Sequence, residues 1–283
     1  SGLDEDDSFR VGTLLLGSPD QVHPSDVHPL LDLTARPVVG HRGNCARAPE
    51  NTLESFRQAV ALGVDALEFD VRVTRDGEIV VFHDPTVQRT TGAEGAVAAL
   101  TLAQLRTLDA GATFSSDGGR THPYRARSVG VPTLAEVLEE LPGTPVLIEI
   151  KVVDAAPGTR SIIERMGAES RCIVASFDAE ALSPFAGSHI PIGAAPGMVA
   201  PLLVPALLGR RFTTLPFQAM SLPRFYRGFP VPLGALARAA APAGVPVHAW
   251  TINSPSTAQA LWRRGVRGII SDDPARILKV RRR

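Results

Sequence analysis

The sequence predicts an α/β fold: a single (β/α)₈ TIM barrel with a capping insertion after its second strand and the hairpin that follows. Eight short apolar runs rich in strand-forming residues recur along the chain, and helical patterns separate most of them. A doubly wound sheet is disfavoured because no glycine-rich dinucleotide fingerprint follows the first run. The predicted strands are residues 37–41, 66–73, 146–151, 171–177, 190–194, 217–222, 246–252 and 268–271, and the predicted helices are 52–62, 133–141, 159–166, 233–243 and 256–264.

The second strand continues into a predicted hairpin. Thr74-Arg75-Asp76-Gly77 is a strong turn sequence, and apolar residues precede and follow it. Folding the chain back about this turn brings His83 nearly opposite Asp70. The hairpin therefore returns a histidine to the end of the barrel that carries the carboxylates discussed below.

Three segments follow from this assignment: an N-terminal extension (1–36), the barrel (37–283), and within it an insertion (85–132). The insertion has no clear alternation of strands and helices, and we expect it to pass over the barrel mouth, because long insertions in compact domains usually serve sites. In the extension, Leu14-Leu15-Leu16 and Leu30-Leu31 indicate partial packing on the barrel.

The composition is that of a soluble protein, with 44% hydrophobic and 20% charged residues. A formal net charge of zero disfavours nucleic-acid binding, which needs a basic surface. Cys45 and Cys172 fall at opposite ends of the predicted barrel, so two free thiols are expected. We expect no transmembrane helix and no signal peptide. These observations leave open whether the protein is cytoplasmic or exported, and they do not indicate an oligomeric state.

Three acidic residues are candidate metal ligands. Glu68 and Asp70 share one face of the second strand near its C-terminal end, where barrel active sites lie. Glu149 stands near the end of the next predicted barrel strand. Three carboxylates without clustered thiolates or imidazoles favour one hard divalent cation, Mg²⁺ or Ca²⁺. The alternative is that Glu68 and Asp70 form ordinary ion pairs with Arg42 and Arg72.

Two histidines and two cations complete the candidate site. His41 ends the first strand, and His83 returns on the hairpin; at one rim they form a candidate acid-base pair. Arg42 offers a planar fork to two phosphate oxygens, and Lys151 offers a point charge. For Lys151 the alternative is a salt bridge within the barrel.

Taken in order, these motifs resemble the glycerophosphodiester phosphodiesterase family, and the similarity runs from about residue 37 to 274. The shared sequences are His41-Arg42-Gly43, Pro49-Glu50-Asn51-Thr52, Glu68-x-Asp70, Asp76-Gly77, Val81-x-His83-Asp84, Arg89-Thr90-Thr91-Gly92, Glu149-Ile150-Lys151, Ser176-Phe177 and Trp250-Thr251-Ile252-Asn253. The resemblance implies a divalent ion on Glu68, Asp70 and Glu149, with His41 and His83 as the acid-base pair. It also implies phosphate contacts from Arg42 and Lys151 and a substrate pocket lined by Trp250. Glu50 and Asn51 shape the first loop and are candidates both for substrate or phosphate binding and for the metal shell.

Two segments depart from the family pattern. The loop Asn44-Cys45-Ala46-Arg47-Ala48 adds a cation and an oxidisable thiol near the mouth. Residues 196–209 are unusually apolar, and Arg210 and Arg211 follow them. This second segment is either an outer helix packed on the barrel or a contact for an acyl chain or a membrane surface.

The function predicted from these residues is metal-assisted hydrolysis of a glycerophosphodiester to glycerol 3-phosphate and an alcohol. We expect His41 to act as base and His83 as acid, with either water or a neighbouring glycerol hydroxyl as nucleophile. Three alternatives remain: a lysophospholipase D or other phospholipid phosphodiesterase acting on a lysophospholipid, a lyase that releases a cyclic phosphate, and a barrel that binds a phosphodiester without turnover.

Overall fold

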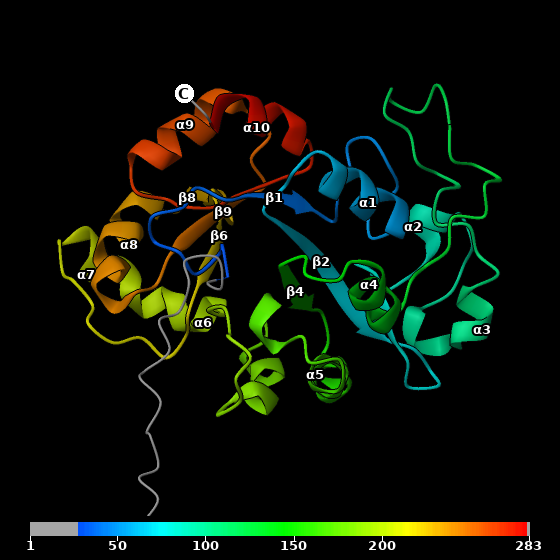
Figure 1. The fold of residues 1–283 in the computed structure, drawn as a ribbon, viewed down its shortest axis with the longest axis horizontal. Helices are drawn as coiled ribbons and strands as arrows, with labels where there is room; N and C mark the ends of the chain where they lie inside the picture. Colours follow the sequence, from blue (N-terminus) through cyan, green and yellow to red (C-terminus); the bar gives the residue numbers. More distant parts are fainter. Residues whose placement is uncertain (1–27, 282–283) are drawn as a thin grey trace, which may run out of the picture.

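A computed structural model describes residues 28–281, which form the predicted barrel (Figure 1). Seven parallel strands lie in the order β5-β4-β2-β1-β10-β9-β6, and β3 pairs antiparallel with β2. The strands are β1 (Val38–His41), β2 (Ala66–Val73), β3 (Ile79–Val81), β4 (Val146–Ile150), β5 (Cys172–Ala175), β6 (Met220–Pro223), β9 (Val247–Trp250) and β10 (Ile269–Ser271), together with a small hairpin of β7 (Phe225–Tyr226) and β8 (Phe229–Pro230).

The predicted strand at 190–194 is the one that does not form a regular strand. This segment still closes the barrel between β5 and β6, through parallel bridges from Ile192 to Val174 and from Gly193 to Ala219. Pro191 interrupts the run and has no N–H to donate, which limits the ladder to isolated bridges. The segment therefore occupies its expected place but lacks a regular ladder.

The predicted helices form within a few residues of their expected limits. Thr52 caps α1, and Thr133 and Glu136 form a capping box on α4, so two starts follow directly from sequence. The helices are α1 (Leu53–Ala61), α2 (Gln88–Thr91), α3 (Leu102–Leu105), α4 (Leu134–Glu140), α5 (Ala156–Arg165), α6 (Pro196–Val199), α7 (Leu203–Leu207), α8 (Leu233–Ala240), α9 (Pro255–Arg263) and α10 (Pro274–Arg281).

The predicted hairpin is confirmed. Val71 lies opposite Val81, and the Phe82 N–H donates to the Asp70 carbonyl at 2.9 Å. On the other side of β2, the parallel register places Asp70 beside Glu149 of β4. The β2 strand is therefore paired on both sides, and it brings a histidine-bearing segment and a second acidic strand to the same rim.

Part of the N-terminal extension fills the barrel interior. Leu30 is fully buried and packs in one cluster with interior side chains of five strands: Val39, Ala66, Leu147, Ile173 and Ile270. The His248 Nε2–H donates to the Leu30 carbonyl, and His248 Nδ1 accepts the Gly268 N–H, each at 2.9 Å. The expected packing of Leu30 is thus observed, whereas Leu14-Leu15-Leu16 lie outside the described residues.

The insertion packs on the β2–β3 hairpin, on the α1 side of the barrel (Figure 1). Its apolar residues form a small separate core with the hairpin, made of Val80, Phe82, Val87, Val97, Leu105, Ala110 and Val131. It contacts the polar rim through Arg89, whose guanidinium donates to Glu50 and Asp84. The insertion therefore supports the rim from the side of the hairpin.

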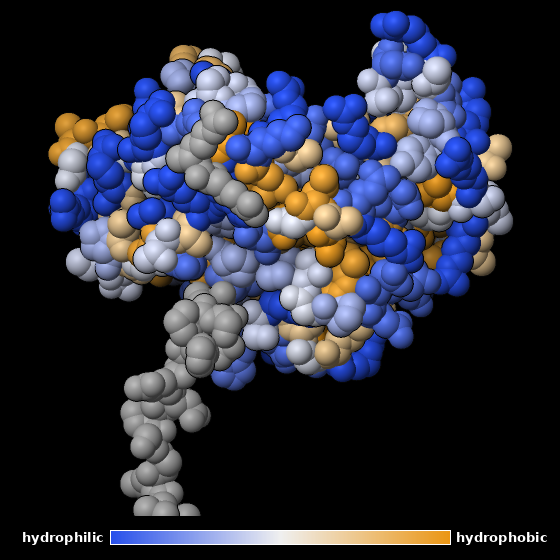
Figure 2. All heavy atoms as spheres, turned by 45° about the horizontal axis from the view of Figure 1, so that its top comes forward, coloured by the Kyte–Doolittle hydropathy of each residue, from blue (hydrophilic) through white to orange (hydrophobic). Residues whose placement is uncertain are grey.

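The surface of the described residues is largely hydrophilic on one face (Figure 2), and both cysteines are free. On the face shown in Figure 2, hydrophilic residues surround separate hydrophobic patches. Between residues 28 and 281, no helix has the length and hydropathy needed to cross a bilayer. Cys45 and Cys172 are both free thiols, as predicted: Cys45 lies in the loop that follows the C-terminal end of β1, and Cys172 is the first residue of β5.

The buried His248 should make stability sensitive to mild acid. Burial lowers its pKa to about 4, and burial likewise lowers that of His28 to about 4. The unfolded chain binds protons near pH 6.5 that the folded chain excludes, so stability falls as pH drops below that value. In urea unfolding, the contribution of each of these histidines should be a loss of about 1–2 kcal/mol between pH 7 and pH 5, which a variant lacking the histidine isolates from the other titrating groups.

Two variants isolate this contribution. His248→Gln should reduce the loss between the two pH values, whereas His189→Gln, which removes an exposed histidine, should leave it unchanged. Equal pH dependence in wild type and His248→Gln would contradict the assignment.

Candidate active site

A cavity of about 620 Å³ opens at the C-terminal ends of the strands. Six of the predicted polar side chains line it: His41, Arg42, Glu68, His83, Glu149 and Lys151. They come from β1, β2, the hairpin and β4, or from the residues that directly follow them. The structure thus brings together residues that are more than one hundred positions apart in sequence.

The turn after β1 depends on two glycines. A Cβ on Gly43 (φ +90°) would lie 2.4 Å from Ser55 Oγ, and one on Gly40 would lie 2.6 Å from the Gly43 carbonyl oxygen. This close packing against α1 holds Arg42 at a φ of 50°. The Arg42 N–H then donates to Glu68 Oε2 at 3.2 Å, which ties the first strand to the acidic second strand.

Glu68, Asp70 and Glu149 offer carboxylate oxygens within 4.8 Å of one another. Burial and the neighbouring Asp70 raise the pKa of Glu68 to about 8. Burial alone would also raise the pKa of Asp70, but Lys151 and Arg42 hold it below its usual range. Such a buried acidic cluster gains from a bound cation, and its all-oxygen donor set suits Mg²⁺ or Ca²⁺.

Both predicted phosphate-binding cations contact these acids. Arg42 Nε lies 3.2 Å from Asp70 and its Nη1 lies 2.8 Å from Glu50, while Lys151 Nζ lies 3.0 Å from Asp70 and 2.5 Å from Glu149. The alternative of ordinary ion pairs is therefore partly realised, although both cations also line the cavity. Arg72 plays a different role, since its Nε donates to the His83 carbonyl at 2.8 Å.

Each histidine is held by its own aspartate. His41 Nδ1 lies 2.6 Å from Asp272, and His83 Nδ1 lies 2.6 Å from Asp84. Because a carboxylate only accepts hydrogen bonds, each Nδ1 carries the proton, and each Nε2 is left to exchange one. The Nε2 of His41 is directed toward Glu68, at 3.8 Å.

The charges around these pairs favour ionised aspartates. Burial opposes ionisation of Asp272, but the hydrogen bond and charge of His41, together with the hydrogen bonds from Asn253 and Cys45, outweigh it and lower the Asp272 pKa to about 2. The Arg89 guanidinium holds the pKa of Asp84 well below its usual range. Burial depresses the His41 pKa, and the nearby Glu68 and Asp272 more than compensate, so the pKa is raised overall.

Sequence reasoning missed the role of Asp272. It follows β10 in Ser271-Asp272-Asp273, inside the segment that resembles the family, but its distance from His41 in the chain hid the pairing. Asn253 donates to Asp272 Oδ2 at 2.8 Å and fixes this carboxylate. Position at the C-terminal end of the last strand was the one signal that could have identified Asp272.

Glu50 and Asn51 stand behind the cavity lining. Asn51 is 3% exposed and donates from Nδ2 to Asp70 Oδ2 at 2.9 Å. Glu50 accepts from both Arg42 and Arg89, at 2.8 and 2.7 Å. In this structure, Asn51 positions an acid of the cluster, and Glu50 links the cavity rim to the insertion.

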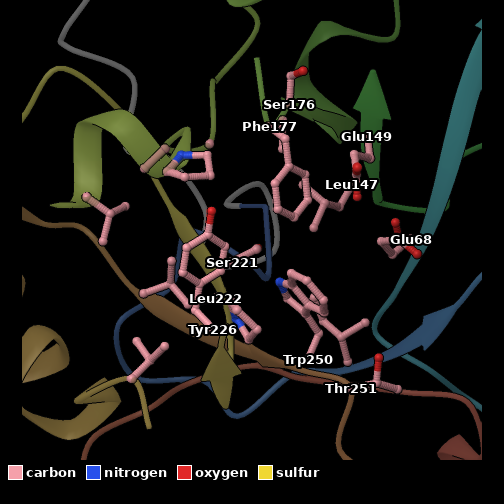
Figure 3. A pocket seen from close by; sticks show the side chains of 18 of the residues that line it. Glu68, Leu147, Glu149, Ser176, Phe177, Ser221, Leu222, Tyr226, Trp250 and Thr251 are labelled. Atoms are coloured by element: carbon pink, nitrogen blue, oxygen red, sulfur yellow. The ribbon is translucent and has the colours of Figure 1, made fainter. Parts of the chain in front are cut away.

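The other end of the cavity is apolar. The ring centroids of Phe177 and Trp250 lie 6.0 Å apart in an edge-to-face arrangement. Figure 3 shows these rings between Tyr226 and the carboxylates of Glu68 and Glu149. Further apolar lining comes from Leu147, Ala194, Pro196, Val199, Leu203, Leu222, Phe229, Val231 and Ile270.

The apolar segment 196–211 contributes to this lining through its first half. It then leaves the cavity: Leu207 and Leu208 are 63% and 81% exposed, and the Phe212 N–H donates to the carbonyl of Ala239, near the end of α8. The first turn of α8 adjoins the cavity, and Arg210 and Arg211 lie toward the other end of this helix, away from the cavity.

Comparison with known proteins gives one consistent family. The model of the Glycerophosphoryl diester phosphodiesterase family matches residues 41–276. A glycerophosphodiester phosphodiesterase of Caldanaerobacter subterraneus is 31% identical over 87% of this chain and 98% of its own length. A probable glycerophosphodiester phosphodiesterase 2 of Mycobacterium tuberculosis is 32% identical over 84% of this chain and 87% of its own.

Solved structures show the same fold. A phosphodiesterase of Oleispira antarctica, solved in complex with the product sn-glycerol-3-phosphate, matches 87% of this chain and 97% of its own at a TM-score of 0.70 and 27% identity. A glycerophosphoryl diester phosphodiesterase domain from Mycobacterium tuberculosis matches 87% of this chain and 99% of its own at a TM-score of 0.78 and 21% identity.

Removing the Glu68 carboxyl from the acidic cluster should raise stability without metal and abolish the stabilisation by added metal. Glu68→Gln removes a buried carboxyl whose ionisation is opposed, so the metal-free variant should be more stable than wild type by about 1–3 kcal/mol at pH 7. Added Mg²⁺ or Ca²⁺ should raise the Tm of wild type and leave that of Glu68→Gln nearly unchanged.

Glu180→Gln is the matched control, because it removes an exposed glutamate. It should keep the wild-type metal response in the same thermal unfolding measurement. A metal response that is as large in Glu68→Gln as in wild type would count against the cluster as the cation site.

Proposed function

Because the chain belongs to the glycerophosphoryl diester phosphodiesterase family, we propose that it hydrolyses glycerophosphodiesters to glycerol 3-phosphate and an alcohol. The observation that carries the proposal is the convergence of three carboxylates, two cations and two histidine–aspartate pairs on one cavity. The product complex of the Oleispira antarctica relative supports the same substrate class.

Glu68, Asp70 and Glu149 are the proposed ligands of one divalent cation, Mg²⁺ or Ca²⁺. When bound, the cation supplies positive charge that orients the phosphodiester and offsets the charge that develops on it. Arg42 and Lys151 both contact Asp70, so both side chains can reach a substrate phosphate that is bound beside the acidic cluster. Trp250 and Phe177 line the path toward the leaving alcohol.

His41 is the proposed base and His83 the proposed acid. In each ring the aspartate fixes the Nδ1–H, so proton exchange takes place at Nε2. His41 Nε2 accepts a proton from the nucleophile, and the Asp272 carboxylate then stabilises the charged ring. Protonated His83 donates from Nε2 to the departing alkoxide, while Asp84 keeps the ring in place.

The activity is tested with glycerophosphocholine as substrate. We expect turnover in Mg²⁺ or Ca²⁺, loss of turnover in EDTA, and recovery when the metal is restored. Phosphorus NMR should show glycerol 3-phosphate as product, whereas a cyclic phosphate would instead identify a lyase. Binding without turnover in either metal would overturn the proposal.

The two histidines should be separately essential. His41→Ala and His83→Ala should each lower kcat by roughly 10²–10⁴, the usual contribution of an acid-base group. His189→Ala serves as the control, since this histidine is exposed and does not line the cavity. Near-wild-type kcat in either cavity variant, with the fold intact by circular dichroism, would rule out its role.

A second substrate class is favoured by the apolar end of the cavity. We propose that it accepts an acyl chain, so that lysophospholipids are hydrolysed as well as glycerophosphodiesters. The residues lining this end include apolar and aromatic side chains and Arg227, and no carboxylate, which favours a hydrocarbon over a cationic group. We propose in addition that segment 196–211 contacts a membrane surface, which would supply such a substrate.

Chain length provides the test. For monomeric lysophosphatidylcholines, kcat/KM should rise about threefold to fourfold per added methylene until the apolar end is filled. Ala200→Trp places a large side chain in this space, so the ratio of long-chain to short-chain kcat/KM should fall roughly tenfold or more.

Phe225→Ser is the matched control for this experiment. Phe225 lies on the β7–β8 hairpin and faces Arg224, whose guanidinium carbon is 5.1 Å from the ring centroid, and it is not among the cavity-lining residues. It should leave the ratio unchanged. A wild-type kcat/KM that is independent of chain length would exclude the acyl-chain role while leaving the hydrolysis of glycerophosphocholine intact.

A further inference from the structure

We propose that His41, Cys45 and Asp272 form a second metal site, selective for a soft or borderline ion such as Zn²⁺, whose occupation inhibits the enzyme. One ligand atom from each of these residues lies within 4.8 Å of the others. The set is separate from the three carboxylates, and it contains the one partly exposed thiol among the described residues. The inhibitory consequence rests on the proposed role of His41, whereas the site itself does not.

His41 and Cys45 both contact the same oxygen atom of Asp272. Asp272 Oδ1 lies 2.6 Å from His41 Nδ1 and 3.1 Å from Cys45 Sγ, so the ring nitrogen and the thiol both donate to the same oxygen. A metal ion would replace these two shared protons with coordinate bonds. Imidazole nitrogen, thiolate and carboxylate oxygen are the donors that zinc takes in proteins, with water in the remaining position.

Solvent has access to the cluster. The Asp272 side chain is 32% exposed and that of His41 is 16% exposed, and Cys45 is partly exposed. Asn253 holds the second oxygen of Asp272, which keeps the carboxylate aimed at the other two ligands. The loop that supplies Cys45 is anchored as well, because the Ala46 N–H donates to the Asp272 carbonyl at 2.9 Å.

The two sites differ in donor chemistry. Glu68, Asp70 and Glu149 provide oxygen alone, which suits Mg²⁺ or Ca²⁺. A thiolate and an imidazole favour Zn²⁺ or Co²⁺ over these hard ions. Excess Mg²⁺ should therefore fill the carboxylate cluster and leave the sulfur-containing site to the softer metal.

The proton balance explains the inhibition. On binding, the thiol proton of Cys45 passes to solvent, and the metal takes Nδ1 of His41. A neutral ring then carries its proton on Nε2, the nitrogen that would otherwise accept one from the nucleophile. Since this changes the base and leaves the phosphate contacts in place, the effect should appear in kcat more than in KM.

Cobalt absorption tests the site without reference to activity. Enzyme stripped with EDTA and then held in excess Mg²⁺ should develop a thiolate-to-cobalt charge-transfer band when Co²⁺ is added. Cys45→Ser should lose the band, and Cys172→Ser should retain it, because Cys172 is buried at the opposite end of the barrel. A band that is absent from wild type, or that persists in Cys45→Ser, would overturn the proposal.

Zinc inhibition tests the consequence. In excess Mg²⁺, Zn²⁺ should lower the kcat of wild type, and Cys45→Ser should need at least roughly tenfold more Zn²⁺ for the same fractional loss of its own zinc-free rate. Equal sensitivity of the two proteins would show that zinc acts at the carboxylates and would refute the inhibitory role. If no substrate is hydrolysed, the proposed function fails, and the cobalt measurement still decides the site.

Discussion

The pairing of β2 with β4 is the constraint on which the site depends, because it forces buried carboxylates together. Asp70 lies directly beside Glu149, and Glu68 shares the face of Asp70 two residues earlier. Burial and repulsion from Asp70 raise the pKa of Glu68 to about 8, because negative charge gathered and buried at this point is costly. Lys151 and Arg42 offset part of this charge, and a cation suits the remainder.

Each histidine is held by an aspartate, which comes from the far end of the chain for His41 and from the next residue for His83. Asp272 follows the last strand and holds His41 at the end of the first, which is possible because β1 and β10 are neighbours. Asp84 holds the adjacent His83 at the end of the hairpin. The barrel closure and the hairpin therefore position the imidazoles, and the β2–β4 register positions the carboxylates. Both groups lie at one cavity.

Much of this could be predicted from local sequence. The apolar runs gave strand positions, the Asp76-Gly77 turn gave the hairpin, and Thr52 marked the start of a helix. The failure at 190–194 has a local cause too, since Pro191 breaks the ladder that the hydrophobic pattern indicates. Spacing could not reveal the partner of His41, because the contact with Asp272 depends on how the barrel closes.

The sequence by itself determined the barrel, the order of its strands in the chain and the chemical types gathered at their ends, because these follow from periodicity and from residue identity. Only the tertiary structure decided which groups touch. It joined Cys45 to the His41–Asp272 pair and put the apolar end of the cavity beside the carboxylates. Contacts of this kind depend on distances between remote segments, and those distances exist only once the sheet has curled and closed.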